Sequence, residues 1–161
     1  MFQGGHNATK SLDNPFWHYS LKQYSNPACA SFLLDAQDNY GLDINILLFI
    51  GWLSTHKPSL ISISHLNSAM KWNQRVIQPI RWFRRKIKIL NVIKAYNWIK
   101  KQELWAEQVE QAMLFLSSQE LAQFNETGYE NFEMNIQVYL KGKIVIEETW
   151  LQALFKHLQP K

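Results

Sequence analysis

The residues best suited to chemistry in this chain form a basic segment with an aromatic neighbour. Four cations recur there at intervals of three or four residues, so a helix would align them on one side: Arg81, Arg84, Arg85 and Lys88. Trp82 lies among them. Guanidinium and ammonium groups bind phosphates, and aromatic rings stack on nucleic-acid bases. The same side chains suit a carboxylate-rich protein surface or an anionic lipid surface. These five residues are therefore the core of a candidate binding face.

The charges are unevenly distributed along the chain. Residues 44–102 contain eleven Lys or Arg and no Asp or Glu, whereas residues 103–161 contain nine Glu and four Lys. The sequence pI of about 9.2 is moderate for a dedicated nucleic-acid-binding protein, and no helix-turn-helix or zinc-finger spacing is present. An acidic protein is therefore the favoured partner of the basic face, ahead of nucleic acid and of an anionic membrane surface.

Glutamates downstream offer a second explanation for the basic segment. In an antiparallel helical hairpin the cations would face three acids: Glu103, Glu107 and Glu110. Charges on the outside of helical bundles are usually paired in this way or simply solvated, and this alternative stays open. An adjacent apolar stripe must face the core, and it consists of Ile80, Phe83, Ile87 and Leu90. We therefore expect the cations on the flank or outside of the bundle, with at least part of the stripe open.

Two residues outside the basic segment complete the candidate site. Asp38 falls in the last turn of an expected helix, where the helix dipole disfavours an anion by up to about 1 kcal/mol. We predict that a Lys or Arg from residues 71–101 pairs with Asp38, and that Gln37 shares the network. Trp17 is assigned as a supporting aromatic group.

The sequence shows no arrangement typical of a catalytic, metal or cofactor site. Asp35, Asp38 and Asp43 are not joined by histidines, and no His lies three residues after a Glu, as di-iron helical bundles require. The histidines lack a paired nucleophile, and nucleophile elbows and glycine-rich phosphate loops are absent. We therefore predict no cofactor and favour a binding protein over an enzyme.

The ten residues from Ile44 to Leu53 carry no charge, and a bilayer, a partner or the protein's own core could bury them. A helix of ten residues is roughly 15 Å long, about half the hydrocarbon thickness of a bilayer, so this one cannot span a membrane. The N-terminal residues lack the apolar segment of a secretory signal. With 47% hydrophobic residues and a single cysteine, the composition is typical of one cytoplasmic globular domain. We expect residues 44–56 to be the central helix of its core.

Capping residues and prolines indicate where the other helices begin and end. The Asn-Pro pairs at 14–15 and 26–27 suit an N-cap followed by the first helical residue. Gly41 can end the second of these helices in a left-handed conformation, and Asp43 is placed to cap the next one. Beyond residue 52 the apolar positions keep a helical period. Pro79 lies within this pattern, so we expect a kink or a break in the helix just before it.

Further helices are expected from about 92 to 116, from 132 to 140 and from 147 to 158. Residues 143–148 suit a short strand, but a lone strand would have no partner. The sequence therefore predicts an all-α fold: a single-domain bundle of about six to eight helices around helix 44–56. A flexible tail of residues 1–12 precedes a single helical domain of residues 13–161.

Several short sequence segments, called phrases here, resemble those of a family of small bacterial proteins, mostly proteobacterial, that has no known function. In chain order the phrases are Asn14-Pro15-Phe16-Trp17, Gln37-Asp38 with Gly41, Asp43 and Asn45, then Trp72, Pro79, Arg81, Arg84-Arg85, Lys88, Glu103, Glu107 and Glu110-Gln111. The resemblance covers roughly residues 13–116. It implies no catalytic residues and no cofactor.

These features predict a non-enzymatic, cytoplasmic helical protein that binds a macromolecular partner, in first place an acidic protein, through its basic aromatic face. Two alternatives stay open. A nucleic-acid or ribosome-associated protein would bind with a steep salt dependence. A small-molecule-binding protein, or an enzyme of unknown reaction, would have an enclosed aromatic pocket.

Overall fold

The computed structural model describes residues 12–125 and 127–160, and these form helices and no strand. The helices are α2 (Pro15–Tyr24), α3 (Pro27–Tyr40), α4 (Ile44–His56), α5 (Ile63–Trp72), η1 (Asn73–Ile77), α6 (Gln78–Ile89), α7 (Ile93–Ser118), α8 (Tyr129–Leu140) and α9 (Glu148–Leu158). The predicted all-α, single-domain bundle is confirmed. The predicted flexible tail lies outside the described residues, apart from its last residue.

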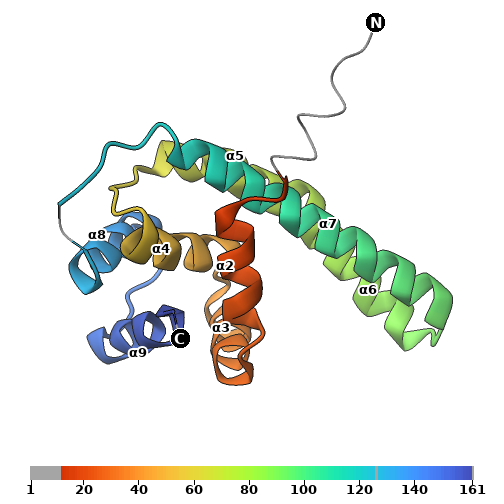
Figure 1. The fold of residues 1–161 in the computed structure, drawn as a ribbon. Helices are drawn as coiled ribbons and strands as arrows, with labels where there is room; N and C mark the ends of the chain where they lie inside the picture. Colours follow the sequence, from red (N-terminus) through yellow and green to blue (C-terminus); the bar gives the residue numbers. More distant parts are fainter. Residues whose placement is uncertain (1–11, 126, 161) are drawn as a thin grey trace, which may run out of the picture.

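The helices are arranged around α4 (Figure 1). α2, α3, α7, α8 and α9 all contact it. The continuous rod of α5, η1 and α6 runs antiparallel to α7, and the two form a long hairpin. One end of the hairpin lies over the bundle, while the other end projects away from it. The projecting part, residues 78–105, is called the arm below.

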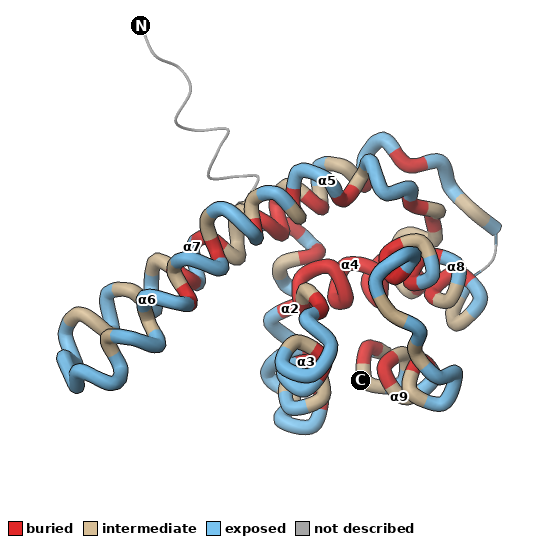
Figure 2. The backbone as a smooth tube through the Cα atoms, turned by 180° about the vertical axis from the view of Figure 1, so that it is seen from behind, coloured by how far each residue is buried: buried red, intermediate tan, exposed pale blue. Residues whose placement is uncertain are grey.

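The uncharged helix α4 is the centre of the core, as predicted. Its residues from 44 to 54 are all buried, and Figure 2 shows this helix as the most completely buried element. Phe16 of α2 and Phe132 of α8 pack around it with no exposed surface. Each such side chain contributes about 1.5 to 3 kcal/mol when it leaves water. Among the described helices, none is both long and apolar enough to cross a membrane.

The predicted caps fix where the first helices begin and end. The Asn14 side chain accepts a hydrogen bond from the Trp17 backbone N–H at 2.9 Å, and Asn26 accepts one from Ala28 at 3.0 Å. Asp43 accepts one from Asn45 at 2.9 Å at the start of α4. Gly41 has a φ of 65°, the left-handed conformation that ends α3 at low cost.

Gly51 allows α9 to approach the central helix closely. A Cβ atom at this position would lie 2.9 Å from Leu158 Cβ and 2.8 Å from Tyr19 Oη, closer than packed side chains allow. The Tyr19 hydroxyl donates a hydrogen bond to the Leu158 carbonyl oxygen at 2.6 Å. The glycine within the apolar run is therefore a contact point between α2, α4 and the end of the chain.

The structure describes two local features that the sequence left open, one before Pro79 and one after residue 140. The interruption before Pro79 is a π-helical turn rather than a break, because the Gln78 N–H bonds to the Asn73 carbonyl five residues back and the rod continues into α6. Residues 143–148 form no strand, as expected of a segment without a partner strand. The chain from 141 to 147 is irregular, and Val145 is fully exposed there, since no neighbouring strand is available to pair with it.

Candidate functional site

A tight turn between α6 and α7 gives the arm its hairpin shape. Asn91 in this turn has a φ of 56°, and asparagine tolerates such left-handed conformations better than most residues. Its N–H donates to the Lys88 carbonyl at 3.2 Å. The turn makes α6 and α7 antiparallel, so the basic residues of α6 face the glutamates of α7 along the inner part of the arm.

Arg81 lies at the base of the arm and is only 7% exposed. Its guanidinium donates to Glu103 Oε1 at 3.3 Å, to Glu107 Oε1 at 2.7 Å and to Gln37 Oε1 at 2.6 Å. Burial lowers the pKa of Arg81, but the hydrogen bond and charge of Glu107 and the charge of Glu103 outweigh it, so the pKa lies above its ordinary value. This cation joins α6 to α7 and α3.

The other three cations of the basic stripe have different surroundings. Arg84 is partly exposed and pairs with Glu103 through Nε and, at 3.2 Å, through Nη2. Arg85 and Lys88 are exposed and form no ion pair with any residue that the structure describes. The stripe is therefore divided: pairing within the protein accounts for Arg81 and Arg84, and Arg85 and Lys88 are open.

The prediction for Asp38 is wrong. The residue is exposed and has no cation within ion-pair distance in the described chain. Its neighbour Gln37 accepts the hydrogen bond from Arg81 instead. Water solvates an exposed carboxylate at the end of a helix, so the unfavourable dipole costs only a few tenths of a kcal/mol and requires no partner.

The expected apolar stripe on α6 does not face a core either. Phe83 is 57% exposed and Leu90 is 67% exposed, whereas Ile80 and Ile87 are half-buried. The reason is architectural, because in the described part of the chain the outer half of α6 packs against α7, which covers a single side of it. Side chains that a third helix would bury in an ordinary bundle remain in water here.

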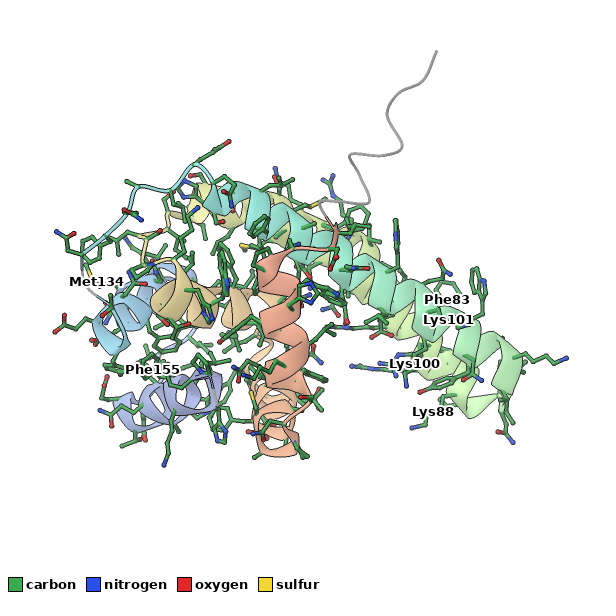
Figure 3. The ribbon with its side chains drawn as sticks, in the orientation of Figure 1. Phe83, Lys88, Lys100, Lys101, Met134 and Phe155 are labelled. Carbon is green, nitrogen blue, oxygen red and sulfur yellow. The ribbon has the colours of Figure 1, made fainter. Side chains whose placement is uncertain are left out.

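The outer part of the arm combines exposed apolar side chains with open cations. Trp82 packs edge-on against Phe83 at a centroid distance of 5.1 Å, and Lys86 Nζ lies 5.5 Å from the Trp82 ring. We call this region the arm surface; its members are Trp82, Phe83, Arg85, Lys86, Lys88, Ile89, Leu90, Val92, Ile93, Lys94 and Trp98. Figure 3 labels Phe83 and Lys88, which lie on the upper and the lower edge of the arm in that view. Exposed apolar clusters of this kind mark interaction sites.

A cleft of about 710 Å³ lies at the base of the arm, between α2 and α3 on one side and α6 and α7 on the other. Of the predicted site residues, it brings together Trp17, Arg81 and Arg84. Asp38 and Arg85 border a smaller cavity of about 270 Å³, and Trp82 and Lys88 line neither. The single site expected from the sequence is therefore divided among the cleft, the smaller cavity and the arm surface.

A buried polar network lies beside the cleft, and it was not predicted from the sequence. Glu110 has no exposed surface and accepts hydrogen bonds from Asn45 Nδ2 at 2.6 Å and Asn73 Nδ2 at 3.3 Å. Gln111 Nε2 donates to Asn45 Oδ1 at 2.8 Å. The expected pairing of Glu110 with the basic helix is thus wrong. Asn45 was the available signal, because a polar side chain in an otherwise apolar central helix must find hydrogen-bond partners.

Burial, followed by the charge of Asp43, raises the pKa of Glu110 to about 10, so its carboxyl group is protonated in the folded protein at neutral pH. In the unfolded chain the group has its ordinary pKa of 4.5. Between these values the folded state holds a proton that the unfolded state has released. The contribution to stability is complete below pH 4.5 and is lost as the pH rises towards 10.

We therefore expect the free energy of unfolding to fall between pH 5 and pH 9, and Glu110→Gln to flatten this slope. Glutamine copies the neutral carboxyl group and cannot ionise. Urea unfolding at pH 5, 7 and 9 measures the effect, and Glu120→Gln, at an exposed position, is the matched control that should keep the wild-type slope. Equal slopes in the wild type and Glu110→Gln would contradict a protonated Glu110.

In the described part of the chain, no three His, Cys, Asp or Glu residues form a group that could hold a metal ion. Asp35 accepts a hydrogen bond from Asn39 at 2.7 Å, and Asp43 caps α4. These two carboxylates therefore have structural partners.

The fold and these surfaces define a class: an all-helical, single-domain protein with a projecting hairpin arm and a cleft at its base. The chain belongs to the family DUF2390, described as a protein of unknown function, whose model matches residues 15–114. The match includes α2 to α6 and most of α7, with the arm and both walls of the cleft. No curated protein and no solved structure matches the chain.

Proposed function

We propose that this is a non-enzymatic cytoplasmic protein that binds an acidic protein partner through the arm surface. The observation that carries the proposal is the pairing of exposed apolar anchors with cations that have no ion pair in the described chain. Residues 44–102 contain no acid, so the charge of the arm calls for a negatively charged partner. Apolar and aromatic side chains would supply most of the binding energy, and the cations would orient the partner.

The anchors on α6 have the spacing of a helix that binds in a groove. Trp82 and Ile89 are seven residues apart, as are Phe83 and Leu90, so each pair lies two turns apart on one side of the helix. Helices that dock into apolar grooves present anchors at such intervals. Lys86 lies between the two pairs, where it can reach a carboxylate on the rim of the groove.

Other macromolecules suit this surface less well. The aliphatic residues Ile89, Leu90 and Ile93 gain little from a phosphate backbone, which is contacted mainly by hydrogen-bonding and charged groups. Trp82 lies about 12 Å from Leu90 along the helix axis. A protein groove can cover the whole length.

The test is an affinity purification on nuclease-treated extract with the native protein as bait. Phe83→Glu combined with Leu90→Glu should abolish recovery of the partner and leave the melting temperature nearly unchanged, since both residues are already exposed. Carbodiimide cross-linking should then join Lys86, which lies on the same side of α6 as the anchors, to Asp or Glu residues of the recovered protein. The matched control is Met134→Glu, an exposed apolar residue on α8 at the opposite end of the molecule (Figure 3).

The possible results separate the candidate partners. The proposal is supported if the double variant Phe83→Glu and Leu90→Glu loses the partner while Met134→Glu still recovers it. The recovery must also resist nuclease, and the cross-links must reach acidic residues. Recovery that nuclease abolishes would assign the arm to nucleic acid. Sedimentation of the protein with phosphatidylglycerol vesicles, lost in the arm variant, would assign the arm to a membrane surface.

A further inference from the structure

The cleft at the base of the arm has the dimensions and the lining of a small-molecule site. Its volume of about 710 Å³ falls within the range of ligand pockets, roughly 300 to 1,000 Å³. Apolar side chains from three helices line it, including Leu21 of α2, Leu34 of α3 and Leu104 of α7, and all three are exposed. The aromatic rings of Trp17, Tyr24 and Tyr96 also contribute to its lining. An apolar body would bury these surfaces.

The charge of the cleft is positive. Its lining contains Arg81 and Arg84, which Glu103 and Glu107 neutralise. Lys100 and Lys101 also line it, and both are exposed without an ion pair in the described chain. Figure 3 shows Lys100 on the edge of the arm that faces α2 and α3. The two lysines leave the cleft with an excess of positive charge, which favours an anionic ligand.

Two buried oxygen atoms in residues that line the cleft lack a hydrogen-bond partner among the described residues. They are Ser20 Oγ and Gln111 Oε1, and each residue is only 3% exposed. A buried polar atom without a partner costs about 1 to 3 kcal/mol. Gln111 lies ten residues beyond Lys101 on α7, roughly 15 Å along the helix axis, so the lysines and this oxygen mark distant parts of the cleft.

We propose that the cleft binds a small, elongated organic anion. Its charged end contacts Lys100 and Lys101, its apolar body packs against the leucines and aromatic rings, and a hydroxyl or N–H group at its other end donates to Ser20 Oγ or Gln111 Oε1. The site is distinct from the arm surface, so the two proposals can fail separately.

Matched biphenyl probes test the three parts of this site. The full probe is 4′-hydroxybiphenyl-4-carboxylate, biphenyl-4-carboxylate lacks the donor, and 4-phenylphenol lacks the charge. Biphenyl-4-yl phosphate distinguishes a phosphate from a carboxylate as the anionic group. Binding is followed by NMR titration. The amide chemical shifts of Ser20 and Asn97, which line the cleft, should change, and that of Asn91 in the arm turn should not.

Variants assign each contact. The double variant Lys100→Ala and Lys101→Ala should bind the carboxylate probes at least tenfold more weakly and bind 4-phenylphenol with unchanged affinity. The matched control is Lys88→Ala with Lys94→Ala, two exposed lysines on the arm outside the cleft. Ser20→Ala should abolish the preference for the hydroxylated probe over biphenyl-4-carboxylate if Ser20 Oγ is the acceptor, and a preference that persists in this variant assigns the contact to Gln111 Oε1. All these variants should melt near the wild-type temperature, because the lysines are exposed and Ser20 Oγ has no partner to lose.

The proposal is overturned if no probe shifts the cleft amides, if the shifts gather at the arm turn, or if 4-phenylphenol binds as tightly as the two carboxylates. Persistence of probe binding in Phe83→Glu with Leu90→Glu would show that the cleft works independently of the arm surface. Loss of probe binding in that variant would contradict the placement of the site.

Discussion

Replacing Leu47 with aspartate is expected to unfold the domain, with a loss of stability above about 4 kcal/mol. Leu47 has no exposed surface and lies in the uncharged helix α4, around which the other helices pack. The new carboxylate would be buried among apolar side chains, and the packing of a large aliphatic side chain would be lost as well. Far-ultraviolet circular dichroism and urea unfolding measure the result.

Two comparison variants make this result interpretable. Leu116→Asp, at a 54% exposed position of α7, should change stability by less than about 1 kcal/mol. Leu48→Asp should fall between the two, because Leu48 is nearly buried but borders the cleft, where water can reach its carboxylate. A Leu47→Asp variant that melts like Leu116→Asp would contradict the central position of α4.

Local signals predicted the helices around α4 well. The Asn-Pro starts, Gly41 and Asp43 each act within a few residues, so the chain near them decides the conformation without help from the rest of the fold. The apolar run of α4 is similarly self-sufficient evidence for burial, because such a helix has no polar side to expose.

Periodicity failed where the answer depended on a third helix. Phe83 and Leu90 have the spacing of a buried stripe, but spacing cannot show whether another element covers it, and the projecting arm leaves it open. The same limit applies to Asp38, whose surroundings depend on how α3 lies beside α6. The alternative in which the basic segment pairs with downstream glutamates holds for Arg81 with Glu103 and Glu107, since this pairing follows from the hairpin alone.

Glu110 shows a different limit. A glutamate near a basic helix is usually a surface ion-pair partner, and charged residues are rarely fully buried. Its burial requires Asn45 from α4 and Asn73 from η1 to meet it at the same place, and only the packing of three helices brings these groups together. The cleft beside this network has the same origin, because its walls come from helices far apart in the sequence.

Replacing Arg81 with methionine is expected to cost about 3 to 5 kcal/mol, the usual effect of removing one partner from a buried ion pair. Glu107 would lose its ion-pair partner, Gln37 would lose a hydrogen bond, and the almost fully buried Glu103 would keep only Arg84 as a cation. The matched control is Arg85→Met on the same helix, which removes an exposed guanidinium without an ion pair in the described chain and should change stability by less than about 0.5 kcal/mol.

A compensating variant separates the loss of the cation from the loss of its packing. Arg81→Met combined with Glu103→Gln and Glu107→Gln removes the two carboxylates that lose Arg81 and keeps side chains of similar volume, so most of the lost stability should return. Arg84 then loses its partner, but it is partly exposed and water can solvate it. Urea unfolding at one pH compares the wild type, Arg81→Met, Arg85→Met and the triple variant. A triple variant no more stable than Arg81→Met would show that the two carboxylates do not destabilise the protein when Arg81 is absent. The role of Arg81 would then be packing at the base of the arm and not charge neutralisation.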